Sequence, residues 1–173
     1  CRHFHIPLQS GDDRILTKMG RPYSRQVFHD LIVKIHELMP DAAMGADTLI
    51  GFPGEIDAAF ENTYNLIKDL PISYLHVFPF SVRPGTPAAD FTDHIPPEII
   101  KDRSEQMRRL GQDKRMNFYR GFIGKTMPVL IETKRDAATG LLKGISSNYL
   151  PVLIDGKEEF KNTIIDVKIE KLE

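Results

Sequence analysis

The sequence predicts an α/β fold that continues into a small all-β barrel. Three times in the first hundred residues, a strand-like run is followed by a polar or glycine-containing turn and then by a helical pattern. A long helical stretch comes next, and after residue 123 the pattern changes to short strands. Strands alternating with helices favour parallel β-α units, whereas several short strands in succession are typical of a small oligonucleotide-binding-like barrel. We therefore predict two domains, residues 1–122 and residues 123–173.

The first domain begins with three predicted strands, residues 3–9, 42–50 and 73–80. Between the first two, Ser24 is expected to cap a helix whose apolar residues recur at helical spacing. A second helix, with Phe60 on its apolar stripe, separates the second and third strands. Three β-α units are too few to close a barrel, so we predict an open sheet or a piece of a larger barrel.

The remaining elements are one helix and four strands. Proline suits the first turn of a helix, so Pro96-Pro97 predicts a helix start, and the pattern continues to about Arg120. The predicted strands of the second domain are residues 127–132, 141–145, 150–154 and 163–170.

Composition excludes several classes of protein. The 173 residues are 41% hydrophobic and 27% charged, as in globular proteins, which argues against disordered, collagen-like and coiled-coil chains. A single cysteine, Cys1, excludes an internal disulfide framework and a site of several thiolates within this chain. No apolar run reaches the roughly 20 residues of a membrane span. We expect a cytoplasmic protein, and a first residue other than Met suggests a piece of a longer one.

Charge is distributed unevenly along the chain. Residues 101–125 contain eight Lys or Arg and three Asp or Glu, although the whole chain has a net charge of −1. Such a basic stretch suggests an anionic partner such as nucleic acid, and a solvated helix face is the alternative. We predict that Arg120 of this stretch contacts RNA.

The turn after the first strand offers Gln9 and Ser10. In an alternating strand, Phe4, Ile6 and Leu8 should pack on helices, which leaves His3, His5 and Gln9 on the other face. Gln9 is a candidate hydrogen-bond partner for a bound ribose or amide, whereas Ser10 could instead cap the following turn. His3 and His5 have the spacing of a ligand pair but no evident third metal ligand, so we predict no metal site.

The turn after the second strand is the richest in candidates. Asp47 lies within an otherwise uncharged strand, and a buried carboxylate must be paired or bind something. It is therefore either a ligand contact or an ion-pair partner of a neighbouring strand. Gly51 and Gly54 would let a ligand approach the backbone closely, and Glu55 would lie at the start of the next helix.

The third turn and the predicted barrel supply the remaining candidates. Ser81 and Arg83 follow the third strand, and an arginine beside a glycine turn suits a phosphate or carboxylate, as does Arg21. In the second domain, three side chains suit base stacking and phosphate contact: Lys143, Asn148 and Tyr149.

Taken in order, several motifs resemble the radical-SAM methylthiotransferase family. The motifs are His5-Ile-Pro-Leu-Gln-Ser-Gly11, Met19-Gly-Arg-Pro-Tyr23, Asp47-Thr-Leu-Ile-Gly-Phe-Pro-Gly-Glu55, Leu75-His-Val-Phe-Pro-Phe-Ser81 and Arg83-Pro-Gly-Thr86. The wording of residues 1–9, 75–79 and 144–152 resembles the branch that acts on threonylcarbamoyl-adenosine in tRNA next to the anticodon. From about Ile123, the chain is similar to the family's TRAM domain, a small RNA-binding β-barrel.

The resemblance implies part of a radical-SAM barrel that binds S-adenosylmethionine (SAM), with tRNA as substrate. It places Gln9 and Ser10 near the SAM ribose, and Leu49, Gly51, Phe78 and Ser81 near its adenine; we add Arg21 and Asp47 as candidate cofactor contacts. The two 4Fe-4S clusters of the family would have their ligands outside this chain, because Cys1 has no partner cysteine. We therefore expect this chain alone to be an inactive, monomeric fragment with no catalytic or metal-ligating residue of its own.

Three other functions remain open at the level of sequence. The enzyme could belong to a branch acting on isopentenyl-adenosine in tRNA or on a ribosomal protein. The basic helix and terminal barrel would also suit a non-catalytic RNA-binding module. Glycine turns with Arg83 would fit a phosphate-binding α/β enzyme of unrelated chemistry.

Overall fold

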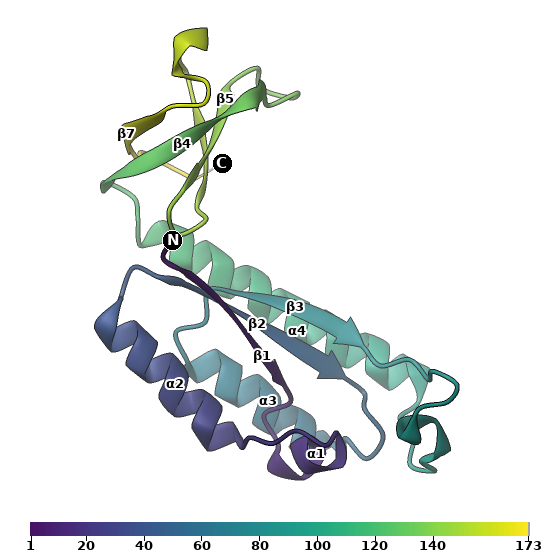
Figure 1. Cartoon of the computed structure of the whole chain (residues 1–173). Coiled ribbons are helices and arrows are strands. Elements are labelled where there is room, and N and C mark those ends of the chain that lie inside the picture. The colour runs from purple at the N-terminus through teal and green to yellow at the C-terminus, as the bar shows by residue number, and fades with distance from the viewer. Residues whose placement is uncertain (173) are drawn as a thin grey trace.

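The computed structural model describes residues 1–172 and contains two sheets joined by one long helix (Figure 1). Strands β1 (His3–Gln9), β2 (Ala43–Ile50) and β3 (Tyr74–Pro79) form a parallel sheet in the order β1-β2-β3. The mixed α/β class predicted from the sequence is therefore confirmed. No helix in the described part of the chain is both long and apolar enough to cross a membrane.

Helices cover one face of the parallel sheet. Helices α2 (Arg25–Leu38) and α3 (Asp57–Asp69) connect the strands, and Figure 1 shows both on the same side. Leu8 and Ile32 are fully buried in the core between them, with Phe4 and Ile6 packed against it. The predicted division of the first strand into an apolar and a polar face is thus confirmed.

Two local features of the first hundred residues differ from the expectations. A short helix, α1 (Asp13–Lys18), follows the first strand, because Asp12 accepts hydrogen bonds from the amides of Arg14 and Ile15 and so caps it. The second helix begins at Ser24 as predicted, since the Ser24 hydroxyl accepts from the Val27 amide. A 3₁₀ turn, η1 (Pro87–Asp90), lies between β3 and the long helix.

The long helix α4 (Pro97–Arg120) has the predicted bounds and contacts both sheets. Met107 and Leu110 belong to the core of the parallel sheet. Near the other end of the helix, Phe118 and Tyr119 pack against Phe122 in a core of the second sheet. The helix thus connects the two parts through side-chain packing as well as through the chain.

The second sheet is antiparallel. Its strands are β4 (Thr126–Arg135), β5 (Leu142–Ser146), β6 (Pro151–Ile154) and β7 (Ile164–Lys168), in the order β6-β5-β4-β7, with a 3₁₀ turn, η2 (Glu158–Phe160), before β7. Strand β7 is shorter than predicted and β4 is longer. Among residues 1–172, β6 and β7 are the sheet edges and are not paired with each other, so the described strands form an open sheet and the predicted small barrel is not shown.

Candidate functional site

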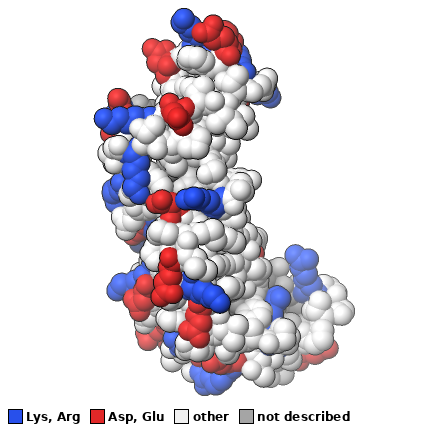
Figure 2. Space-filling view, turned by 60° about the vertical axis from the view of Figure 1, so that its left-hand side comes forward, with Lys and Arg blue, Asp and Glu red and all other residues white. Residues whose placement is uncertain are grey.

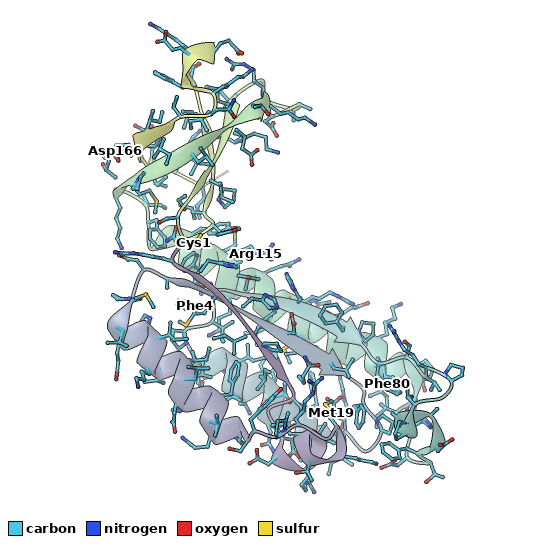
Figure 3. The ribbon with its side chains drawn as sticks, viewed as in Figure 1. Cys1, Phe4, Met19, Phe80, Arg115 and Asp166 are labelled. Atoms are coloured by element: carbon cyan, nitrogen blue, oxygen red, sulfur yellow. The ribbon has the colours of Figure 1, made fainter. Side chains whose placement is uncertain are left out.

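The carboxyl ends of the three parallel strands lie at one edge of the first sheet. Gln9 pairs in register with Thr48, Ile50 pairs with Pro79, and the Phe80 amide donates to the Ile50 carbonyl at 2.7 Å. The turns that carry Gln9, Gly51 and Ser81 therefore follow neighbouring strands, as the sequence predicted. Figure 3 shows Phe80 and Met19 at this end of the sheet.

At this edge, the candidate site residues differ in how exposed their side chains are. Arg21, Ser81 and Arg83 are exposed, Phe78 is half-exposed, and Gln9 is partly buried with a left-handed φ of 67°. Ser10 differs from the expectation of a ribose contact, because it is buried and its hydroxyl faces Thr63 of α3. That hydroxyl also accepts from the Asp12 amide, so Ser10 stabilises the turn.

The glycine turn after β2 also needs a correction. Gly51 has a φ of 83°, and a Cβ atom there would lie 2.3 Å from Cγ1 of Ile100. Helix α4 thus closely approaches this backbone on the side where a side chain would stand, and glycine is needed there for packing. Leu49 is partly buried and packs against a small apolar cluster that contains Phe52.

Beneath this turn lies an ion pair that the sequence analysis missed. Glu55, expected at the start of a helix, is fully buried. One of its carboxylate oxygens accepts from the Gly51 amide at 2.8 Å and from Arg103 at 3.2 Å. Arg103 also donates to the Glu55 carbonyl at 2.6 Å. Burial raises the pKa of Glu55 to about 7, against the opposing effects of Gly51 and Arg103. Helix α3 begins only at Asp57, so Glu55 lies in the turn before it. Its contact with Arg103 joins this turn to α4.

The exposed face of the parallel sheet holds a chain of polar and aromatic side chains. Asp47 accepts from His5 at 2.8 Å and lies 3.3 Å from His76. The Tyr74 hydroxyl lies 2.7 Å from Nε2 of His3 and 3.4 Å from Nδ1 of His5. Asp47 is therefore paired with both neighbouring strands, which is the structural alternative that the sequence left open. His76 and Tyr74 were missed, although their alternation with Phe78 places all three on one face.

This chain of side chains continues to the junction with the second sheet. The ring of His3 stacks on Tyr149 with centroids 4.2 Å apart, and the Arg115 guanidinium lies 5.9 Å from the centre of the Tyr74 ring. Tyr149 is half-exposed. Figure 3 shows Arg115 and Cys1 close to this junction.

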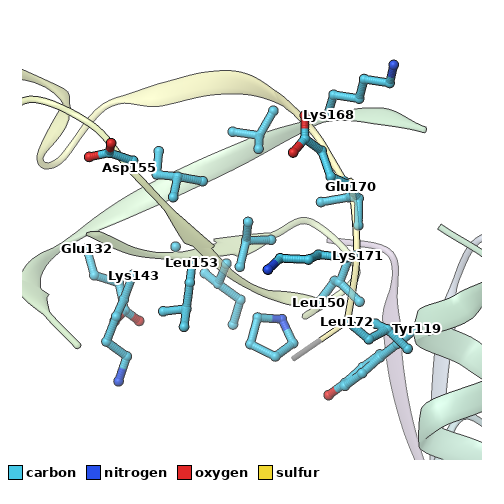
Figure 4. A pocket seen from close by; sticks show the side chains of 17 residues that line it. Tyr119, Glu132, Lys143, Leu150, Leu153, Asp155, Lys168, Glu170, Lys171 and Leu172 are labelled. Atoms are coloured by element: carbon cyan, nitrogen blue, oxygen red, sulfur yellow. The ribbon is translucent and has the colours of Figure 1, made fainter. Parts of the chain in front are cut away.

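The candidate RNA contacts are separated in the structure. Arg120 is exposed and donates to Asn117 at the end of α4, while Lys143 lines a cavity of about 770 Å³ in the second sheet (Figure 4). Asn148 differs from the expectation, because it is only 2% exposed. Its side chain binds Ser146 and the Asp41 carbonyl, so it serves the junction and is not free to contact RNA.

Charge is mixed on the face that Figure 2 presents. Lys and Arg side chains are interspersed with Asp and Glu, and broad areas carry neither. A continuous positive surface does not appear on this face, so any RNA contact there would depend on individual side chains.

Comparison with known proteins shows what parts of this chain are similar to. Residues 1–67, which include β1, β2 and the helices between them, match the sequence model of the Radical SAM superfamily. Proteins of that name use SAM together with an iron-sulfur cluster, so SAM is the cofactor that the match implies.

Two curated relatives are similar over nearly the whole chain. Both carry the name tRNA-2-methylthio-N(6)-dimethylallyladenosine synthase, one from Pelotomaculum thermopropionicum and one from Protochlamydia amoebophila. They are 32% and 34% identical, each over 98% of this chain. The chain spans 38% of the length of each relative. It is thus similar to a segment of tRNA methylthiotransferases.

These names correct one prediction. The sequence motifs favoured the threonylcarbamoyl-adenosine branch, but both relatives are named for dimethylallyl-adenosine, which is the isopentenyl branch. Similarity in a few short motifs is weaker evidence for the branch than 32% sequence identity over 169 residues. The prediction of the threonylcarbamoyl branch is therefore wrong.

The residues of this chain fit SAM better than they fit an iron-sulfur cluster. A 4Fe-4S cluster is held by several cysteine thiolates, and the sequence contains only Cys1, which is exposed. This chain therefore does not fit a cluster. At the strand edge, by contrast, the half-exposed ring of Phe78 and the side chains of Gln9 and Ser81 offer a stacking surface and hydrogen-bonding groups suited to a nucleoside.

Proposed function

We propose that this chain is part of an enzyme that adds a methylthio group to N6-dimethylallyl-adenosine in tRNA with SAM as cofactor. The similarity of 98% of the chain to two synthases of that name carries the proposal. Residues 1–122 would form part of the SAM-binding barrel, and residues 123–173 a TRAM-like RNA-binding domain. When bound, SAM would supply the adenosyl and methyl groups that such chemistry requires.

Within this chain, three residues are the best candidates to hold SAM. Phe78 offers its exposed ring to the adenine, while Gln9 and Ser81 offer an amide and a hydroxyl to the sugar. These side chains would bind and orient the nucleoside at the edge of the sheet. Arg21 and Arg83 are exposed beside this edge and suit a carboxylate or phosphate.

RNA would be held near the junction of the two sheets. Tyr149 presents a half-exposed ring on which a base could stack, and Arg120 and Lys143 are exposed cations beyond it. Arg115 is also exposed on α4 beside Tyr74, which supports the same location. The proposed RNA contacts thus extend from Tyr149 at the junction to Arg120 at the end of α4 and Lys143 in the second sheet.

The proposal is tested on the longer protein that carries this chain, with its clusters reconstituted without oxygen. Incubation with SAM and tRNA containing N6-dimethylallyl-adenosine should give the 2-methylthio nucleoside, detected by mass spectrometry. Phe78→Ala should raise the KM for SAM about 2- to 10-fold, since one aromatic stacking contact contributes about 0.5–1.5 kcal/mol. Tyr149→Ala should instead raise the KM for tRNA.

The matched control is Ile164→Ala, which removes another exposed large apolar side chain, here from the second sheet. It should change neither KM. Methylthiolation of a protein, or no product on dimethylallyl-adenosine tRNA with active clusters, would contradict the proposed substrate. An unchanged KM for SAM in Phe78→Ala would contradict the proposed cofactor contact alone.

A further inference from the structure

Three potential metal ligands converge on the exposed face of the parallel sheet, one from each strand. His5 lies on β1, Asp47 on β2 and His76 on β3. Asp47 and His76 are direct partners in the register of β2 and β3, while His5 is opposite Gly45, two residues before Asp47. The strand register, and not a flexible loop, therefore brings the three side chains together.

The distances from Asp47 to the two histidines suit neighbouring ligands of a single cation. Oδ1 of Asp47 lies 2.8 Å from Nε2 of His5 and 3.3 Å from Nδ1 of His76, and all three atoms are within 4.8 Å of one another. Ligand bonds to zinc are about 2.0–2.2 Å long. Two such bonds at right angles separate their ligand atoms by about 3 Å, and at the tetrahedral angle by about 3.4 Å. Both Asp47 distances match this spacing.

Neighbouring side chains hold His5 in the orientation that a metal ligand needs. Its other ring nitrogen, Nδ1, lies 3.4 Å from the Tyr74 hydroxyl, which in turn lies 2.7 Å from Nε2 of His3. Metal-binding histidines characteristically hydrogen-bond through the nitrogen that faces away from the metal. Tyr74 can occupy this place because Gly45 lacks a side chain: a Cβ there would lie 2.1 Å from the Tyr74 ring.

From this geometry we infer a binding site for a divalent transition-metal ion such as Zn²⁺ at His5, Asp47 and His76. Two imidazoles and one carboxylate suit zinc and its neighbours in the first transition series, whereas calcium and magnesium prefer oxygen ligands alone. The side chains of His5 and His76 are 35% and 50% exposed, so the ion would keep coordination positions open to solvent. This site contains no cysteine, and it does not depend on the proposed function.

The experiment titrates Zn²⁺ into the purified chain and measures binding by calorimetry. Cys1 is replaced by Ser in every sample. That background is needed because the exposed thiol of Cys1 is itself a zinc-binding group. One Zn²⁺ should bind per chain, and thermal unfolding should shift upward in its presence. Co²⁺ should give the visible absorption of nitrogen and oxygen ligands at the same stoichiometry.

Variants assign the site. His76→Gln and Asp47→Asn should each weaken Zn²⁺ binding by more than 10-fold, and Tyr74→Phe by about 10-fold, the lower end of the effect of removing a group that orients a ligand. His29→Gln is the matched control, since His29 forms a similar contact with Asp30 at 2.9 Å on α2. It should leave the affinity unchanged.

Two results would overturn the inference. Zn²⁺ binding that is equally tight in His76→Gln would place the ion elsewhere. No Zn²⁺ binding to the chain in which only Cys1 is replaced would show that the cluster is a hydrogen-bonded network and not a metal site. Circular dichroism without metal checks the folding of each variant. If His76→Gln does not fold, the Co²⁺ spectrum of the chain in which only Cys1 is replaced decides. A spectrum without the signature of imidazole ligands would contradict the site.

Discussion

At the scale of single residues, the most unusual group is the buried carboxyl of Glu55. Its Oε1 has no hydrogen-bond partner among the described residues, while Oε2 accepts from Gly51 and Arg103. A buried acid with one unsatisfied oxygen loses hydration that its partners replace only in part. The pKa of Glu55 therefore rises from 4.5 to about 7.

This raised pKa predicts a loss of stability with increasing pH. Between pH 4.5 and 7 the folded chain keeps the Glu55 proton that the unfolded chain releases, so the free energy of unfolding falls as pH rises through this window. The full loss is about 3 kcal/mol, since each unit of pKa corresponds to about 1.4 kcal/mol. Urea unfolding at pH 4.5 and 7.5 should show it in the unsubstituted chain and not in Glu55→Gln.

The control for this prediction is Glu61→Gln on α3, which changes an exposed carboxylate of the same helix region. It should retain the pH dependence of the unsubstituted chain. Parallel pH profiles for the unsubstituted chain and Glu55→Gln would show that the Glu55 carboxyl has an ordinary pKa.

At the scale of elements, the turn after β2 fixes the distance between the sheet and helix α4. Gly51 has a positive φ, and Ile100 fills the space where its side chain would be. Gly85 provides a comparison within the same chain, because its φ of 80° is similar but nothing lies within 4 Å of its Cβ position. Substitutions at the two glycines therefore distinguish the energetic cost of backbone strain from that of a steric clash.

Gly51→Ala should destabilise the chain more than Gly85→Ala does. Alanine at a left-handed φ costs about 1–2 kcal/mol at either position. At Gly51 the clash with Ile100 should add about 1–3 kcal/mol, the usual cost of inserting an atom into a packed site. Chemical denaturation measures both changes, and Ile100→Ala in the Gly51→Ala chain should recover the additional part. Equal destabilisation by the two glycine variants would show that α4 shifts without cost.

The sequence predicted these elements better than it predicted their contacts. Alternating apolar residues and the Ser24 cap indicate β1 and α2 directly, because period and capping are local properties. Glu55 was misplaced because its partner, Arg103, is 48 positions away in the sequence. The same holds for the exposed face: His5 and Asp47 were candidates, but only the strand register adds His76.

At the scale of the whole molecule, a few polar contacts and one aromatic stack join the two sheets. Asn148 donates to the Asp41 carbonyl at 2.8 Å, and Lys125 lies 3.1 Å from the Asp41 carboxylate. The Arg2 amide donates to the Ser147 carbonyl at 2.8 Å, beside the stacked rings of His3 and Tyr149. Sequence could not reveal this junction, because Asn148 reads as an ordinary exposed turn residue.

Asn148→Ala should weaken the junction. The substitution removes the acceptor of the Ser146 hydroxyl and the donor to the Asp41 carbonyl, and leaving such a group unsatisfied costs about 1–3 kcal/mol where it is buried. Hydrogen exchange should become faster for amides near Asp41 and Ser146, while β2 amides in the core should change only with global stability. Asn117→Ala, which removes an exposed amide from α4, should leave the exchange unchanged. No local change in Asn148→Ala would show that the other contacts suffice.

The continuity of α4 makes the relative orientation of the two sheets a matter of residue count. Met107 and Leu110 belong to one core and Phe118 to the other, with uninterrupted helix between them. Each residue of an α-helix advances 1.5 Å and turns by about 100°. A single insertion or deletion between Leu110 and Phe118 would therefore rotate the antiparallel sheet by about a quarter turn against its neighbour. The length of this helical segment therefore determines how the two sheets are oriented.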